Sequence, residues 1–176
     1  MQVRGKNGDL ANVGDDGRLT VASVSTPEDR SLNDDGKVFS VYFVVTPTGA
    51  GDYFFYLKNN GTKNIVITDI RIKSTVATTI YYKAVSGTAS AGTDAAVTNR
   101  NLGSSRQLDA AASYDVDITG LTDEGVLFFD SCDTAENMES LKTTSTIIIP
   151  QGQAIAFQRE AATGEIEAVV SVVESS

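Results

Sequence analysis

The chain has 176 residues, enough for one hydrophobic core, and its single cysteine, Cys132, excludes an intrachain disulfide. It has no histidine, and therefore lacks the commonest general base and neutral metal ligand; its net charge of −9, without any basic run, disfavours binding to DNA or RNA. No stretch approaches the ~18 apolar residues of a membrane span, and the start has no signal-peptide core, so we expect a soluble protein made in the cytoplasm.

The first 36 residues differ in composition from the rest of the chain. Gly, Asp and Asn gather there in the turn-like clusters GKNGDL, GDDGR and NDDGK, with isolated apolar residues between them. Residues 10–13 and 18–21 flank the turn sequence Gly14-Asp15-Asp16-Gly17, which predicts a β-hairpin. Because few large side chains are present, we expect residues 1–36 to form an arm that packs on the body, residues 37–176, or on a neighbouring subunit.

The body begins with KVFSVYFVV, in which apolar residues alternate as in a β-strand. Alternate positions from Phe39 to Val45 are apolar on one face. Val38, Tyr42 and Val44 make the opposite face nearly as apolar. This pattern predicts a strand that is covered on both sides and that supplies a self-interface.

Residues 53–57 predict the next strand, and 64–73 its partner. Between them, Asn59-Asn60-Gly61 is typical of a hairpin turn. The alternation of apolar residues shifts by one position within the second strand. A bulge near Thr68-Asp69 would return its isoleucines to one face.

Residues 85–105, VSGTASAGTDAAVTNRNLGSS, are small and turn-forming and follow a further strand at 75–85. Most connections in compact domains have about 4–6 residues, so a loop of this length is expected to be functional or disordered. We predict a long projecting loop, as in a surface-binding or assembly protein.

The remaining strands are short and bounded by turn residues; we expect them at 113–121, 125–130, 143–150, 154–160 and 165–173. Residues 133–142 predict one short helix, with Asp133 as its cap and Glu136 three residues on. Strands of this length, joined by tight turns, must form packed sheets or a barrel to hide their edges. We therefore predict an all-β antiparallel sandwich, with a jelly roll favoured over a simpler sandwich.

Carboxylates recur in pairs along the chain, but none has EF-hand spacing, and Asp beside Gly is typical of tight turns. Asp115 and Asp117 would share one face of a strand, as catalytic carboxylates do in some hydrolases. The same alternation places Tyr114, Val116 and Ile118 inward, which explains the pattern without chemistry. We expect no enzymatic activity, no catalytic residue, no metal and no cofactor.

Isolated cations in an acidic chain are candidates for contact with a partner. Arg100 and Arg106 can pair with carboxylates of a neighbour, although ordinary surface pairing explains them as well. The candidate partner-binding residues from the arm and the loop are Leu10, Val13, Arg18, Leu19, Val21, Arg100, Asn101 and Arg106.

Several segments resemble structural proteins of tailed-bacteriophage virions. DDGRLTV resembles their N-terminal segments, and the body resembles phage jelly-roll proteins in DYFFYLKNNGTKNIVITDIRI, SGTASAGTDAAVTNRNLGSS and IIIPQGQAIAF. The likeness spans residues 8–173 and is one of pattern, without an invariant chemical signature.

The resemblance implies a non-enzymatic protein on the capsid surface of the virion, a decoration or cement protein that bridges subunits of the major capsid protein. It also implies that the protein is a homotrimer. Its partners would be its own subunits and the major capsid protein, and it would bind neither nucleic acid nor a membrane. An alternative is a tail, baseplate or fibre component that binds a glycan or host receptor.

Overall fold

The computed structural model describes residues 2–4, 10–13, 19–20, 28–132, 139–141, 146–160 and 164–175. The chain divides into two compact units, Met1–Ser31 and Leu32–Ser176. The sequence had suggested a boundary after residue 36.

The smaller unit holds a three-stranded antiparallel sheet. Its strands are β1 (Gln2–Arg4), β2 (Leu10–Val13) and β3 (Leu19–Thr20), in that spatial order. The predicted hairpin is confirmed, because Val13 pairs with Leu19 across the turn sequence.

A short helix that the sequence did not predict, α1 (Glu28–Asp34), precedes the first strand of the larger unit. Gly36, two residues beyond its end, has a φ of 67° and donates its N–H to the carbonyl of Asn33 at 2.9 Å. Lys37 donates to the carbonyl of Leu32, also at 2.9 Å. These two bonds form a helix C-cap that favours glycine, because its left-handed conformation is costly for residues with a Cβ atom.

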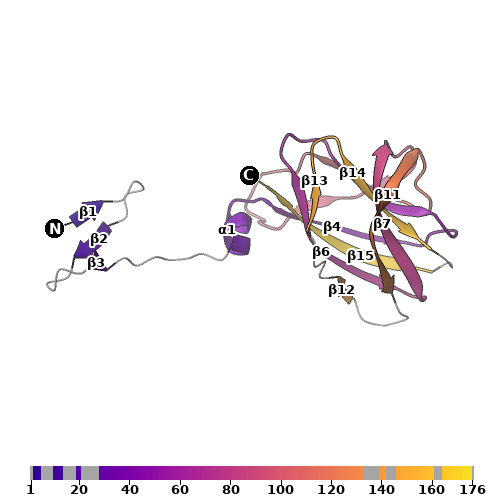
Figure 1. The fold of residues 1–176 in the computed structure, drawn as a ribbon, viewed down its shortest axis with the longest axis horizontal. Coiled ribbons are helices and arrows are strands. Elements are labelled where there is room, and N and C mark those ends of the chain that lie inside the picture. The colour runs from indigo at the N-terminus through magenta and orange to yellow at the C-terminus, as the bar shows by residue number, and fades with distance from the viewer. Residues whose placement is uncertain are drawn as a thin grey trace. The chain divides into compact units, whose positions relative to one another are not determined.

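The larger unit, called the body below, is a sandwich of two antiparallel sheets (Figure 1). The β4 sheet has the order β12-β6-β15-β4-β9, and β13 also pairs with β6. Its strands are β4 (Val38–Val45), β6 (Ile65–Ser74), β9 (Val97–Asn99), β12 (Glu139–Leu141), β13 (Ile147–Ile149) and β15 (Ile166–Glu174).

The opposing β5 sheet has the order β11-β7-β14-β5-β10-β8. Its strands are β5 (Tyr53–Asn59), β7 (Thr78–Gly87), β8 (Thr93–Asp94), β10 (Ala110–Tyr114), β11 (Leu121–Cys132) and β14 (Ala154–Arg159). The predicted all-β antiparallel sandwich is therefore confirmed.

The core lies between the sheets and contains aromatic side chains from both of them. Phe43 of the β4 sheet stacks on Phe55 of the β5 sheet, with ring centroids 4.7 Å apart and planes 7° apart. Phe157 packs against both Phe55 and Tyr82, again with centroids 4.7 Å apart. All four rings are buried, so the alternation seen in the sequence identifies the inward face of these strands.

The predicted hairpin of residues 53–57 and 64–73 is wrong, because β5 and β6 lie in different sheets. The turn between them is a corner held by the side chain of Asn59. Its amide donates to the carbonyls of Lys63 at 2.7 Å and Ile149 at 2.8 Å, and its oxygen accepts the N–H of Gly61. These bonds replace those of a tight hairpin turn.

The bulge predicted near residues 68 and 69 is confirmed in the pairing of β6 with β15. Ser171 pairs with Asp69 and Val172 with Ile67, so Thr68 is the extra residue. Ile67 and Ile70 are consequently both buried.

The expectation that β4 is covered on both faces is not met by the described residues. Phe39 and Phe43 are buried as predicted, but Tyr42 and Val44 on the other face are exposed. The physical reason is that the second sheet covers only one face of β4.

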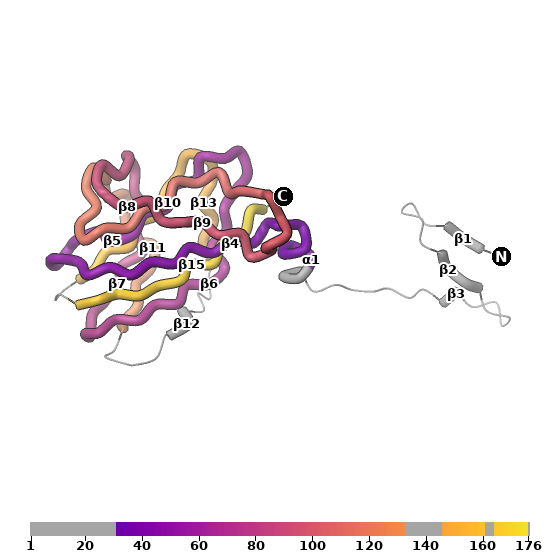
Figure 2. Tube along the Cα trace, turned by 180° about the vertical axis from the view of Figure 1, so that it is seen from behind, coloured from indigo at the N-terminus to yellow at the C-terminus, as the bar shows by residue number. Residues whose placement is uncertain are grey.

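The stretch 85–105 is not one structureless loop, as the sequence had suggested. It contains β8, which pairs with β10, and β9, which pairs with β4. In Figure 2, which shows the body from the other side, β8 lies near β10 and β9 lies near β4. The alanine-rich sequence suits this position, since the small side chain of Ala95 is buried there.

The helix predicted at residues 133–142 is contradicted at Glu139–Leu141, which form strand β12 and pair with β6. Residues 133–138 and 142 lie outside the described residues. The unfilled hydrogen bonds of β6 favour an extended partner, and they outweigh the local helix signal.

The strand predicted at 113–121 is too long, because β10 ends at Tyr114. The backbone N–H of Val116 donates to the side-chain carboxylate of Asp115 at 2.6 Å. This bond takes the place of a backbone hydrogen bond to a neighbouring strand. Ile118 is buried, as expected, but Val116 is exposed.

Candidate functional site

The segment that follows α1 is fastened to the body by two asparagines of the β9–β10 region. Asn99, the last residue of β9, donates its side-chain amide to the carbonyl of Gly36 at 2.9 Å. Asn101 donates its amide to the carbonyl of Asn33 at 3.1 Å, and its backbone N–H binds the side-chain oxygen of Asn99 at 2.9 Å. The start of the body is therefore fixed by side-chain hydrogen bonds from a distant part of the sequence.

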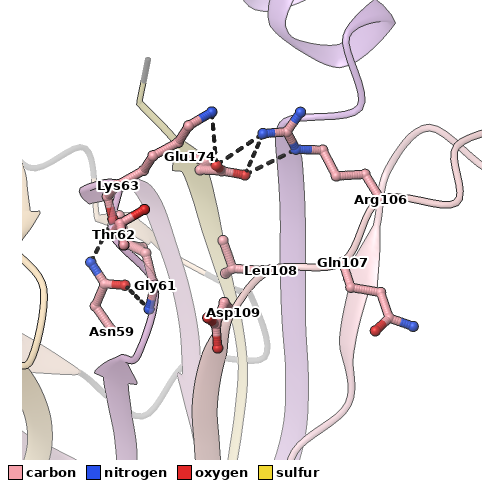
Figure 3. Close-up of a pocket in the computed structure, with 10 residues that line it drawn as sticks. Asn59, Gly61, Thr62, Lys63, Arg106, Gln107, Leu108, Asp109 and Glu174 are labelled. Atoms are coloured by element: carbon pink, nitrogen blue, oxygen red, sulfur yellow. Dashed lines mark hydrogen bonds and ion pairs between the residues drawn. The ribbon is translucent and has the colours of Figure 1, made fainter.

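Next to this junction, one carboxylate holds two cations. The Arg106 guanidinium donates through Nε and Nη2 to the two carboxylate oxygens of Glu174, both at 2.9 Å. The Nζ atom of Lys63 lies 3.3 Å from the same carboxylate. Figure 3 shows Lys63 and Arg106 approaching Glu174 from opposite sides. Because the Glu174 side chain is only 15% exposed, the paired cations compensate a partly desolvated charge.

A pocket of about 330 Å³ opens beside this ion cluster. It lies at the β5–β6 corner, along the segment before β10 and at the end of β15. Its lining residues are Asn59, Gly61, Thr62, Lys63, Ile65, Arg106, Gln107, Leu108, Asp109 and Glu174. The lining holds two cationic side chains, Lys63 and Arg106, and two carboxylates, Asp109 and Glu174. Because both cations are paired with Glu174, the pocket wall is polar but has no net charge.

Among the described residues that line this pocket there is no serine, cysteine or histidine, the side chains from which Ser-His and Cys-His hydrolytic sites are built. Within the same described ranges, no group of three or more Cys, Asp or Glu side chains is close enough to hold a metal ion. Asp115 and Asp117 lie beyond the end of β10 and not on one strand face. What the geometry provides is a set of fixed contacts that support the junction after α1.

The candidate partner-binding residues fall in two places. Leu10 and Val13 are in β2, and Leu19 is in β3, all in the smaller unit. Arg18 and Val21 lie outside the described residues.

The other three candidates lie between β9 and β10. Arg100 is exposed, Asn101 binds the end of α1, and Arg106 binds Glu174 of its own chain. Contact of Arg100 with a neighbour stays a prediction.

Asn99 and Glu174 were not identified from the sequence. Asn99 makes hydrogen bonds to Gly36 and Asn101, and Glu174 binds Arg106. An asparagine at a strand end and a glutamate near the C-terminus carry no local signal of a distant partner. Only the sheet topology, which brings β15 and β9 to either side of β4, places them together.

A second surface, on the outer face of the β5 sheet, was not predicted at all. Val126 and Leu127 of β11 are each 51% exposed, and Phe129 is 64% exposed. Phe129 pairs with Tyr81 of β7, and their ring centroids lie 6.0 Å apart. We call Tyr81, Val126, Leu127 and Phe129 the β11 patch.

Carboxylates accompany the β11 patch. Glu160 accepts the Tyr81 hydroxyl at 3.1 Å, and this hydrogen bond raises the pKa of Tyr81. Lys83, which pairs with Val126 across β7 and β11, forms an ion pair with Asp123.

This ion pair favours the ionised form of Asp123. The hydrogen bond from Lys83 is the main cause that lowers the pKa of Asp123, and the N–H of Gly125 also binds that carboxylate, at 2.9 Å. The Lys83 Nζ atom also lies 5.8 Å from the centroid of the Tyr53 ring. The charge of Lys83, on the strand next to the edge strand β11, is thus compensated by Asp123.

The described part of the chain contains no helix long and apolar enough to cross a membrane. Comparison with known proteins found no matching family model, no matching curated protein and no matching solved structure.

Proposed function

We propose that the protein is a non-enzymatic virion structural protein of a tailed phage, a decoration or cement protein that stabilises the head by bridging subunits of the major capsid protein. The observation that carries this proposal is the division of one short chain into two compact units, a small sheet and a sandwich. Two linked binding units raise each other's effective concentration on a repeating shell.

The strand pairing of the body supports a jelly roll, the fold that the resemblance implies. The first strand, β4, pairs with the last, β15, and β5 pairs with β14. Further inward along the chain, β6 pairs with β13 and β7 with β11. A long antiparallel ribbon rolled on itself produces this nested pairing, as in viral jelly rolls.

The fixed start of the larger unit supports a structural role for the protein. Asn99, Asn101 and the cap at Gly36 fix the first residues of the body. The start of the larger unit is therefore held to the β9 edge of the β4 sheet by side-chain hydrogen bonds.

The proposal also includes self-association as a homotrimer on the capsid surface. The exposed Tyr42 and Val44 on the outer face of the β4 sheet are the residues we assign to that contact. Light scattering of the purified protein measures the trimer directly, and a monomer at every concentration would remove this part of the proposal.

The experiment that tests the head-binding role compares the full chain with a variant that begins at Leu32. Heads assembled without this protein are mixed with each variant and sedimented. We expect the full chain to sediment at a fixed copy ratio and the truncated body, its fold checked by circular dichroism, to bind much more weakly. Equal binding of the two proteins would contradict bridging by two units.

The alternative role, a tail or fibre component that binds a host glycan, is favoured by one observation. Sugar sites use exposed aromatic rings with polar groups beside them, and Phe129 and Tyr81 with Glu160 have that composition. A glycan array screened with the wild type and with Phe129→Ser tests this role.

A further inference from the structure

The β11 patch lies on an edge strand, and edge strands usually bind partners by adding a strand to the sheet. β11 is poorly suited to that mode, because its register with β7 shifts twice, between Asp123 and Gly125 and between Val126 and Phe128. Such bulges interrupt the row of backbone groups that a further strand would pair with. The exposed side chains, and not the strand edge, are therefore the surface open to a partner.

The charge around the patch defines what kind of partner fits. On the face of β7 and β11 that carries the patch, Lys83 is compensated by Asp123, and Glu160 adds a second carboxylate at Tyr81. Asp130 pairs with the buried Ile80 and therefore lies on the opposite face of β11. An apolar centre with a net negative surround complements a surface that has an apolar centre and a positive surround.

Two other occupants fit less well. A second copy placed on the same patch would bring carboxylates against carboxylates, which costs association energy. A glycan would use the rings of Phe129 and Tyr81, but it gains little from the aliphatic side chains of Val126 and Leu127 beside them.

We propose that the β11 patch binds a protein surface in which an apolar side chain is surrounded by lysines or arginines. This inference rests on the proposed function, in which the head shell supplies that surface, and it names the part of the body that contacts the shell. Phe129, the most exposed ring of the patch, is the anchor of the contact.

The test uses the full chain and heads that lack it. Phe129→Ser should weaken head binding by about tenfold or more, the loss of one buried anchor. The matched control is Leu102→Ser, which removes an apolar side chain that is 92% exposed in the β9–β10 connection, and it should bind as the wild type does. Added NaCl should weaken the wild-type interaction. If Phe129→Ser binds like the wild type, the inference is wrong although the proposed function stands.

A second measurement separates the inference from the proposed function. The probe is the peptide Ac-KKFKK-NH2, titrated into the labelled protein, with Ac-EEFEE-NH2 as the opposite-charge control. We expect the basic peptide to shift the NMR amide signals of β7 and β11 and the acidic peptide to leave them unchanged. If wild-type protein does not bind heads, the proposed function fails, and the peptide result alone decides the inference. Shifts caused equally by both peptides, by neither, or by a neutral oligosaccharide instead would overturn it.

Discussion

Asn101 donates its side-chain amide to the backbone carbonyl of Asn33 at 3.1 Å and so joins the β9–β10 connection to the end of α1. The two residues are far apart in the sequence. Their bond holds the first residues of the body against the β9–β10 connection. With the bond from Asn99 to Gly36, it fixes the first residues of the larger unit.

Replacing Asn99 with alanine should loosen this junction without disrupting the core. The variant loses the hydrogen bonds to Gly36 and Arg106 and the acceptor for Asn101. Each lost bond costs about 0.5–1.5 kcal/mol. We expect faster hydrogen exchange and proteolysis at residues 32–37, with Asn60→Ala, an exposed asparagine, as the control. Unchanged exchange there would show that the side chain does not hold the segment.

The pairing of Arg106 with Glu174 is measurable by a double-mutant cycle. Arg106→Met, Glu174→Gln and the double variant, unfolded in denaturant, should give a coupling energy of about 1 kcal/mol, because the pair is bidentate and partly buried. Arg106→Lys should recover only part of it, since lysine lacks the planar fork. A coupling near zero would make this an ordinary surface pair.

Two phenylalanines should differ sharply in their contribution to folding. Phe55 is fully buried and stacked on Phe43, so Phe55→Ala should cost about 3–5 kcal/mol of unfolding free energy. Phe129 is mostly exposed, and Phe129→Ala should change stability by about 0.5 kcal/mol or less. Equal losses for the two variants in urea unfolding would contradict the assignment of the β11 patch as a free surface.

Gly87 and Gly152 both have positive φ, 96° and 77°, but differ in surroundings. A Cβ atom on Gly87 would lie 2.5 Å from the carbonyl oxygen of Gly120, whereas one on Gly152 would meet nothing within 4 Å. Gly152→Ala should therefore cost about 1–2 kcal/mol for the left-handed backbone alone. Gly87→Ala should cost clearly more, and thermal unfolding of the two variants compares them.

The ion pair of Lys83 with Asp123 predicts a pH effect on the β11 patch. Because the folded protein lowers the pKa of Asp123, its stabilising contribution is present above the ordinary aspartate range. That contribution is lost as the pH falls through the lowered value. Lys83→Met should return the Asp123 pKa toward the ordinary range in an NMR titration, and Lys58→Met is the control. An unchanged pKa would show that Lys83 does not set it.

The all-β class, the inward faces and the bulge at Thr68 follow from the sequence because they depend on local alternation. Phe39, Phe43 and the isoleucines of β6 repeat with the period of a strand, and burial follows that period. The bulge is visible as a slip in the same period.

The predictions that failed concern features that depend on pairing between distant segments of the chain. A turn sequence such as Asn59-Asn60-Gly61 does not reveal whether the next strand joins the same sheet or the opposite one. Likewise, nothing local to Glu174 or Asn99 indicates Arg106 or Gly36 as a partner. The β11 patch was missed because GVLFFD has the composition of a core strand, whereas Val126 and Phe129 lie on the outer face of an edge strand.

The most direct test of the cement role is the thermal stability of heads with and without the protein. A ligand that binds only the assembled shell raises the shell's melting temperature in proportion to the logarithm of its free concentration. Heads saturated with the full chain should therefore melt at a higher temperature than undecorated heads, and the shift should grow with added protein. An unchanged melting temperature at saturating protein would contradict stabilisation of the head by this chain.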